Sequence, residues 1–325
     1  MTTETSNVAV ENGIAAEGLT SKTLSPAQMA VKRYLQHKGA VISTVLMAIM
    51  VIIVVLAPFT TRYGINESIF EAVKGRPNSY LPPRAEAWFG TDSIGRDVYS
   101  RMIYSLRVSL IIGLFTAIFS TLVGVAVGAV AGLRGGRFDD LMMRVTDIFL
   151  AFPFLVALLI VRSFLGELEF VTVVVGDRSS IRFIILLFVI FGWMGVARLV
   201  RGSVIALKER EFIEAARALG ASDFRIVTRH LLPNSIGPIL VALTSTVVGA
   251  IIGEATLSFF GFGPDAGSGK TSLGLLVADA KGGVSAGYWW LVIFPCGLLC
   301  IVALCVNFIG DGLRDATDPR LERGN

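Results

Sequence analysis

Residues 108–132 read VSLIIGLFTAIFSTLVGVAVGAVAG, a run without a single charged side chain. Such a run is longer than the roughly 20 residues that a helix needs to cross about 30 Å of hydrocarbon. Similar apolar runs lie at 40–60, 145–164, 183–200, 236–260 and 288–310. A chain inside hydrocarbon must satisfy its own backbone hydrogen bonds, which a helix does. The pattern therefore predicts an all-α polytopic membrane protein with six transmembrane helices.

The composition agrees with a membrane protein. Of 325 residues, 54% are apolar and 17% are charged, against roughly 25% charged in soluble domains, and the mean hydropathy is +0.70. The net charge of +4 forms no basic stripe with interleaved aromatic residues, which argues against a nucleic-acid partner. Cys296, Cys300 and Cys305 share one apolar run, where thiols usually act as small apolar groups, so we expect neither a disulfide nor a metal site.

The distribution of Lys and Arg predicts the orientation. With the N-terminus in the cytoplasm, 17 of the 29 Lys and Arg residues fall on the cytoplasmic side, as the positive-inside rule favours. Residues 1–38 are rich in Ser, Thr, Ala and Glu and predict a flexible cytoplasmic tail. We expect a membrane domain at 39–312 with a cytoplasmic loop at 201–235, followed by a cytoplasmic tail at 313–325.

Several residues inside the runs predict local features. Gly124, Gly128 and Gly132 leave one helix face without side chains, so another helix backbone approaches closely there, and packing within this chain is favoured over a subunit contact. Pro153 should kink its helix. Arg144 and Asp147 are spaced to pair on one helix face.

Glu254 is an acid within the fifth run. An acid at that depth normally faces protein or a watery cavity. It has two equally supported roles: a place in the translocation path, or a structural hydrogen bond to a neighbouring helix.

The sequence offers no catalytic or nucleotide-binding constellation. Its histidines are His37 and His230, neither beside a nucleophile. Gly269-Lys270-Thr271 matches the end of a phosphate-binding loop, but Pro264 stands where that loop needs a glycine. Proline has no N–H to offer a phosphate, so we expect no nucleotide site and no enzymatic activity.

The segment at 207–234, LKEREFIEAARALGASDFRIVTRHLLPN, predicts a helix–turn–helix. Apolar residues at helical spacing should share one face of the first helix, namely Phe212, Ile213, Ala216 and Leu219. Gly220 should end that helix in a left-handed conformation. Ser222 should cap a second helix that stops before Pro233. An amphipathic segment lying on lipid is the alternative interpretation.

This segment resembles the cytoplasmic signature of binding-protein-dependent importer permeases, in which Glu-Ala-Ala and Gly precede a hydrophobic–x–Leu–Pro ending. His230 occupies the hydrophobic place before that ending. In that family the first short helix docks on a cytoplasmic ATPase subunit. The resemblance therefore implies an ATPase-coupling role for the residues Phe212, Glu214, Ala215, Ala216, Leu219, Gly220, Leu232 and Pro233.

Three further segments resemble the dipeptide/oligopeptide/nickel permease group, specifically its second, C-type permease: GTDSIGRDVYSRMIYSLRVSL at 90–110, LSFFGFG at 257–263 and GDGLRDATDPR at 310–320. The resemblance implies the type I ABC importer permease fold in a bacterial inner membrane, with both termini cytoplasmic. It implies a second homologous permease as heterodimer partner, two cytoplasmic ATPase subunits that bind ATP and Mg, and an extracytoplasmic substrate-binding protein. This chain would bind no cofactor itself.

The cargo implied is dipeptides or oligopeptides, and nickel or another metal chelate is the alternative. A more distant alternative is an ion-coupled secondary transporter. Such a transporter should show paired intramembrane acids and an inverted repeat, whereas the sequence has one deep acid, Glu254.

Overall fold

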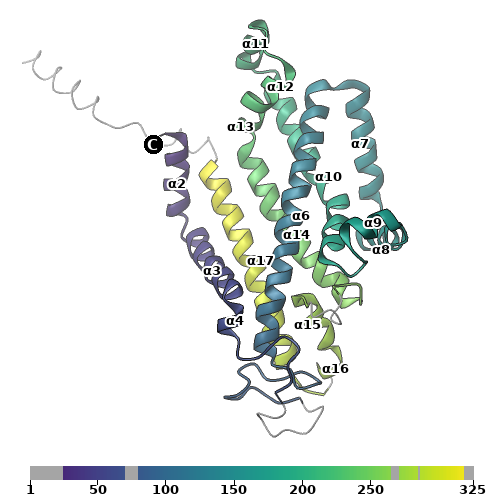
Figure 1. Ribbon diagram of the computed structural model, residues 1–325. Coiled ribbons are helices and arrows are strands. Elements are labelled where there is room, and N and C mark those ends of the chain that lie inside the picture. The colour runs from purple at the N-terminus through teal and green to yellow at the C-terminus, as the bar shows by residue number, and fades with distance from the viewer. Residues whose placement is uncertain (1–24, 70–79, 265–270, 285, 318–325) are drawn as a thin grey trace, which may run out of the picture.

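The computed structural model describes residues 25–69, 80–264, 271–284 and 286–317. Within these residues the regular structure is helical, and five helices are long and apolar enough to cross a membrane (Figure 1). A bent pair of helices supplies the sixth candidate. The five are α3 (Lys38–Val55), α6 (Val98–Arg134), α10 (Ile181–Lys208), α14 (Ile236–Phe259) and α17 (Trp290–Thr317). The predicted all-α, multi-span class is confirmed.

The longest helix, α6, begins at Val98, ahead of the apolar run predicted from 108. Asp97 caps it, because its carboxylate accepts a hydrogen bond from the backbone N–H of Ser100 at 2.8 Å. The first turns of α6 are therefore specified by a polar cap and not by hydropathy, which is why the run of apolar residues does not reveal them.

Helices α6 and α10 pack through the glycine stripe. A Cβ added at Gly128 would lie 2.3 Å from the carbonyl oxygen of Ala197, and one added at Gly132 would lie 2.9 Å from Val204. A Cβ at Gly124 would lie 2.6 Å from Val196. The prediction that these glycines serve packing within the chain is confirmed.

The predicted third span, 145–164, is not one helix. α7 (Gly136–Ala151) and α8 (Phe154–Leu165) meet at an angle of 101°. Phe152 is extended, with φ −80° and ψ 142°, since a residue before proline avoids the helical region. Pro153 therefore breaks the helix where we expected a kink.

The arm formed by α8 and α9 (Glu169–Val175) lies against the side of the bundle (Figure 1). Leu158 and Val171 pack there in one buried cluster with Phe183 and Leu187 of α10. Asp147 pairs with Arg198 of α10. The expected pair with Arg144 was wrong, because a partner on a facing helix satisfies the carboxylate instead.

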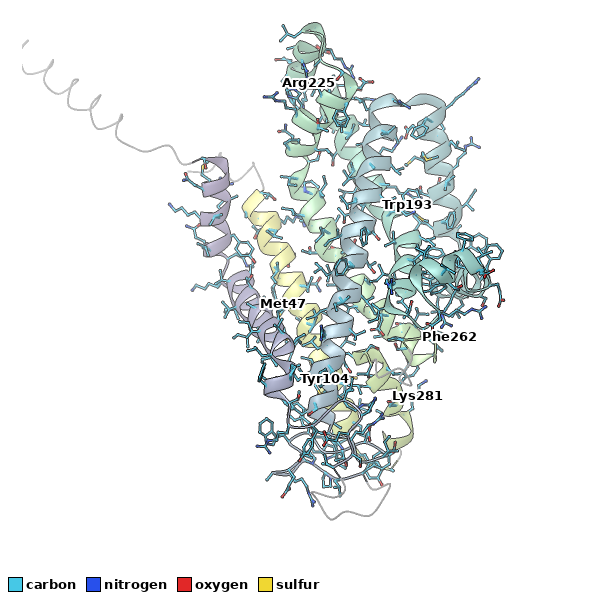
Figure 2. All side chains as sticks on the ribbon, viewed as in Figure 1. Met47, Tyr104, Trp193, Arg225, Phe262 and Lys281 are labelled. Atoms are coloured by element: carbon cyan, nitrogen blue, oxygen red, sulfur yellow. The ribbon has the colours of Figure 1, made fainter. Side chains whose placement is uncertain are left out.

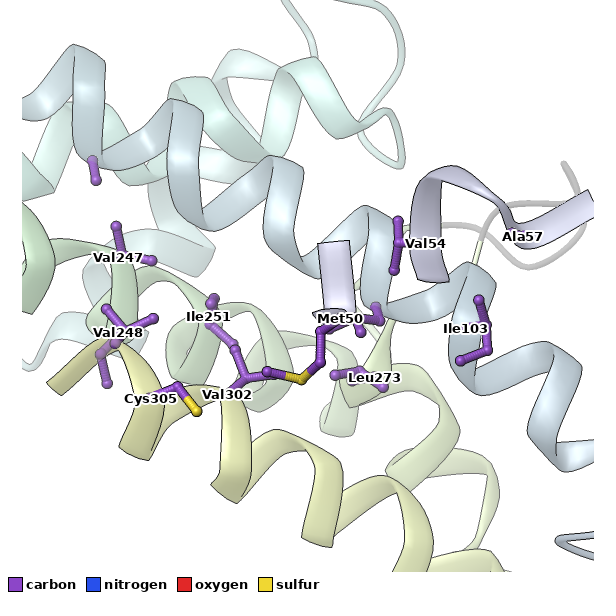
Figure 3. Packing of buried hydrophobic residues seen from close by; sticks show 13 residues of the cluster. Met50, Val54, Ala57, Ile103, Val247, Val248, Ile251, Leu273, Val302 and Cys305 are labelled. Atoms are coloured by element: carbon purple, nitrogen blue, oxygen red, sulfur yellow. The ribbon is translucent and has the colours of Figure 1, made fainter. Parts of the chain in front are cut away.

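The central core joins α3, α6, α14 and α17 (Figure 3). Met50, Ile251 and Val302 meet there, together with Leu273 from the short helix α15 (Leu273–Asp279). Burial of these side chains brings α3, α14 and α17 together and packs α15 against α14.

The bundle has two distinct ends. At one end, the loop end, lie α2 (Pro26–Gln36), the last turns of α17 and the α10–α14 loop, which we define as residues 209–235 (Figure 1). At the opposite end lie α4 (Ala57–Thr60), α15 and α16 (Lys281–Val284). In Figure 2, Arg225 marks the loop end, and Tyr104 and Lys281 lie toward the opposite end.

The N-terminal segment differs from the predicted flexible tail. Ser25 and Gln28 form a reciprocal capping box at the start of α2, and Tyr34 lies against Gly312 of α17. Residues 26–36 are therefore a packed helix, held by a cap that composition alone does not reveal. Residues 1–24 and 318–325 lie outside the described residues.

Candidate functional site

The α10–α14 loop begins with α11 (Glu211–Ala218). Gly220 follows it with φ +80°, the left-handed conformation in which glycine carries no steric penalty. The N–H of Ala221 donates to the carbonyl of Ala216 at 3.0 Å, and the N–H of Gly220 donates to that of Arg217 at 2.9 Å. These bonds close the end of α11, so the predicted role of Gly220 as a helix terminator is confirmed.

The second half of the loop is longer than predicted. Ser222 caps α12 (Asp223–Ile226) by accepting from the N–H of Arg225. The backbone then continues through a π-helical turn, Val227–Leu231, into α13 (Leu232–Asn234). The expectation that this helix stops before Pro233 was wrong, because Pro233 sits in the first turn of α13, where no N–H is needed.

The inner face of the loop is narrower than its pattern suggests. Ile213 is fully buried and Ala216 is 8% exposed, and Ile213 packs in a cluster with Ile226 and Val204. Leu219, expected on the same face, is 88% exposed. Since α11 ends at Ala218, Leu219 no longer follows the helical spacing, and this part of the prediction was wrong.

The outer face presents apolar side chains at the very end of the molecule. Leu219 and Phe224 are 88% and 78% exposed. Phe212 is 43% exposed and lies beside His230, with ring centroids 6.5 Å apart, so His230 packs on the first helix of the loop. Of the other predicted coupling residues, Leu232 is half-buried, while those exposed are Glu214, Ala215, Gly220 and Pro233.

Glu254 has no exposed surface. Its carboxylate accepts hydrogen bonds from the hydroxyl of Ser258 at 2.5 Å and from that of Ser109 on α6 at 3.2 Å. The Ser109 hydroxyl also accepts from the N–H of Leu273 at 3.2 Å. The hydroxyl oxygens of Ser272 and Ser258 lie 3.2 Å apart. The cluster ties α14, α6 and the start of α15 together, which favours the structural role of the two we considered.

A charged network at the opposite end was missed by sequence reasoning. The side chain of Arg101 is 3% exposed. Its guanidinium donates to Asp92 at 2.7 Å and to Asp279 of α15 at 3.1 Å, and Arg96 donates to Asp92 at 2.7 Å. The spacing of four between Asp92 and Arg96 was a local signal, but nothing in the sequence connects Arg101 with Asp279. Beside this network, burial raises the pKa of the helix-capping Asp97.

The remaining sequence candidates have simple surroundings. The cysteines Cys296, Cys300 and Cys305 are free. Thr271 is buried, and its hydroxyl accepts from Ser105 at 3.2 Å. Gly269 and Lys270, which with Thr271 resembled a phosphate-binding loop, lie outside the described residues. Within the described part of the chain, no three His, Cys, Asp or Glu side chains gather as metal ligands do.

These features define the class of the protein: a multi-span α-helical membrane protein that presents one exposed helical loop at one end of its bundle. Residues 124–323 match the binding-protein-dependent transport system inner membrane component family. Residues 25–83 match the N-terminal transmembrane domain of oligopeptide transport permease C. The chain therefore belongs to the binding-protein-dependent transport permease family, as its motifs predicted.

Relatives match along almost the whole chain. The dipeptide transport system permease protein DppC of Bacillus subtilis is 34% identical, over 96% of this chain and 92% of that protein. The oligopeptide transport system permease protein OppC is 35% identical in Bacillus subtilis, over 97% of this chain and 96% of that protein. The OppC of Escherichia coli K12 is 36% identical, over 90% and 91%.

Among solved structures, the chain is similar to one from the inward-facing MetNI methionine ABC transporter. The TM-score is 0.54 with 21% identity, over 67% of this chain and 96% of that chain. At 21% identity this similarity shows the fold alone. The fold is that of a type I ABC importer permease.

Proposed function

We propose that the chain is the C-type permease subunit of an ATP-driven importer of dipeptides and oligopeptides. The observation that carries this proposal is the match, over at least nine-tenths of the chain, to relatives named as dipeptide and oligopeptide permeases. The chain would form half of the translocation path, and a second homologous permease would form the other half as its heterodimer partner.

The α10–α14 loop is the proposed contact with a cytoplasmic ATPase subunit. Its exposed residues supply the argument, since Leu219 and Phe224 offer apolar surface at the tip of the molecule, and exposed apolar patches mark interaction sites. Buried Ile213 anchors α11 to the bundle, so a force on the loop reaches α10. ATP and Mg would bind to two such ATPase subunits and not to this chain.

The proposed orientation puts the loop end in the cytoplasm of a bacterium, with the chain in the inner membrane. The Lys and Arg bias supports it, as does the presence of α2 and the last turns of α17 at the loop end, an arrangement that an even number of crossings produces. The opposite end would receive the extracytoplasmic substrate-binding protein.

Thiol labelling tests this orientation. Ser222 and Ser93 are both exposed and lie at opposite ends of the bundle. In intact cells with a permeable outer barrier, a membrane-impermeant thiol reagent should label Ser93→Cys and leave Ser222→Cys unlabelled. Labelling of Ser222→Cys alone would show that the orientation is the opposite of the proposed one, and would contradict the proposed ATPase contact.

Reconstitution tests the cargo. The chain is assembled with its partner permease, ATPase subunits and binding protein in liposomes, and ATP hydrolysis is measured. A peptide-loaded binding protein should stimulate hydrolysis more than a nickel-loaded one. The reverse order would replace the peptide assignment with a metal-chelate assignment.

A further inference from the structure

The helix α2 has one covered face and one uncovered face. The covered face packs on α17 and α3, and Tyr34 lies there against Gly312 of α17. On the uncovered face, which we call the α2 outer face, Val31 and Leu35 are 60% and 63% exposed. Lys32 is exposed beside them. Because the covered face is held by the bundle, the direction of the α2 outer face is fixed as well.

The α2 outer face continues the exposed apolar surface of α3. His37 alone separates the two helices. Both pack on α17 and lie on the same side of it (Figure 1), so their exposed faces point away from the bundle. Large apolar side chains are exposed along the whole of α3, namely Ile42, Val45, Ile49 and Ile52. The apolar surface of this membrane span therefore extends beyond the span into α2.

The length of α3 places α2 at the membrane surface. Its 18 residues extend about 27 Å, close to the roughly 30 Å of a hydrocarbon core. A bilayer with its headgroups is about 40–45 Å thick, which leaves a headgroup layer of roughly 5–7 Å on each side. Leu35 precedes Lys38, the first residue of α3, by about 4.5 Å along a helix axis. The α2 outer face thus enters the layer of lipid headgroups.

The ionisable charge of this segment is positive. Residues 26–38 hold three Lys and Arg residues and no Asp or Glu. Lys32 and Lys38 are exposed, and neither makes a salt bridge within the described part of the chain. The nearby Asp315 of α17 pairs with His37 instead, at 3.6 Å. Exposed lysines beside apolar side chains are the combination with which amphipathic helices bind anionic lipid surfaces.

We propose that the α2 outer face binds anionic phospholipid. Lys32 and Lys38 pair with the negatively charged headgroups, while Val31 and Leu35 lie against the apolar region below them. An exposed lysine close to an anionic leaflet favours that surface about fivefold. Because Tyr34 holds α2 on α17, lipid bound here would keep α3 and α17 at one depth in the membrane. The inference is independent of the proposed peptide cargo.

Three protein occupants are the alternatives. An ATPase subunit works in the aqueous phase and does not account for an apolar surface that continues a membrane span. The partner permease would have to bring carboxylates to Lys32 and Lys38, whereas anionic lipid supplies negative charge along the whole layer. Residues 1–24 of this chain carry three Glu and one Lys, so they are the alternative that a test must separate from lipid.

Photo-crosslinking in the complete complex identifies the occupant. The complex is placed in liposomes of equimolar phosphatidylglycerol and phosphatidylcholine with identical acyl chains. It carries Leu35→Bpa, where Bpa is the photoreactive benzoylphenylalanine, and the adducts are identified by mass spectrometry. The matched control is Ile49→Bpa, because Ile49 is 46% exposed in the middle of α3, where both lipids present the same acyl chains. We expect lipid adducts at both positions, with a phosphatidylglycerol-to-phosphatidylcholine ratio about fivefold higher at 35 than at 49.

Two double variants test the role of charge. Lys32→Gln with Lys38→Gln should lower the lipid ratio at position 35 to the value at position 49. Lys32→Arg with Lys38→Arg should keep the ratio high, because the positive charge remains. Both double variants should assemble normally, since the two lysines are exposed. Val31→Bpa repeats the measurement at an independent position of the α2 outer face.

Several outcomes would overturn the inference. Adducts at position 35 with residues 1–24, an ATPase subunit or the partner permease in place of lipid would name the true occupant. A lipid ratio equal at positions 35 and 49, or unchanged in the Gln double variant, would show contact with lipid but no recognition of its charge. Lipid adducts at position 49 with none at positions 31 and 35 would place α2 outside the headgroup layer.

Discussion

Gly220 provides the most direct test of the coupling assignment. With φ at +80°, an L-residue such as alanine costs roughly 1–2 kcal/mol in backbone strain. No atom lies within 4 Å of the added Cβ, so Gly220→Ala brings strain without a clash inside this chain. A free-energy change of that size shifts the population of the native loop by about 5–30-fold.

Two further substitutions separate strain from contact. Gly220→Asn should behave nearly as wild type, because asparagine tolerates the left-handed conformation. Gly220→Leu carries about the same backbone strain as Gly220→Ala, since this chain leaves open space around the position. Any additional loss in Gly220→Leu therefore reports a partner surface that closes over the loop.

The assay measures binding-protein-stimulated ATP hydrolysis by the complex in liposomes, together with the amount of permease in the membrane. Stimulation should fall in the order wild type, Asn, Ala, Leu, with membrane levels unchanged, because the substitution lies outside the membrane. If Gly220→Ala retains full stimulation, the left-handed turn is not needed for coupling. If Gly220→Ala and Gly220→Leu lose the same amount of stimulation, no partner surface lies near Gly220. The alternative interpretation, that the loop is an amphipathic segment lying on lipid, then regains support.

Other predictions concern stability. Gly128→Leu should separate α6 from α10, because its Cβ would lie 2.3 Å from the carbonyl oxygen of Ala197. We expect the free energy of unfolding to fall by about 1–3 kcal/mol or more, measured by thermal unfolding in detergent. Arg101→Met should destabilise by about 3–5 kcal/mol, as removal of one member of a buried ion pair does, and Arg101→Lys should recover part of it; equal melting temperatures for the two would count against the network. Glu254→Leu should lose about 1–3 kcal/mol for the hydroxyls left unpaired, while Glu254→Gln should remain folded and transport-competent; inactive but stable Glu254→Gln would return the residue to the translocation path.

Much of the fold follows from the sequence because hydropathy acts over whole helices. The runs behind α3, α14 and α17 are visible without any partner, as is the close approach at Gly128. The identity of the helix that packs on Gly128 is not visible, because a helix face without side chains says nothing of which helix meets it. The 101° break at Pro153 exceeds the expected kink, because Phe152 before the proline also left the helix.

The candidate site was predicted best where one residue decides the backbone. Gly220 adopts the expected conformation because few other choices are available to a helix end of this kind. Leu219 was assigned to the wrong face, since the periodic pattern was continued one residue past the end of α11. Arg101 and Asp279 meet only after α15 packs against the bundle, so their pairing depends on tertiary structure.

The glycine-mediated contact between α6 and α10 has a mechanical consequence. Only Glu209 and Arg210 separate α10 from α11, and backbone-to-backbone contact leaves little slack between the two long helices, which therefore act as one rigid lever. With 37 residues, α6 is about 56 Å long. A rotation of this lever by about 10° would move its far end by about 10 Å. Because the loop continues directly from α10, a movement of the loop should turn these two helices together and reach the turn of α6 that holds Arg101.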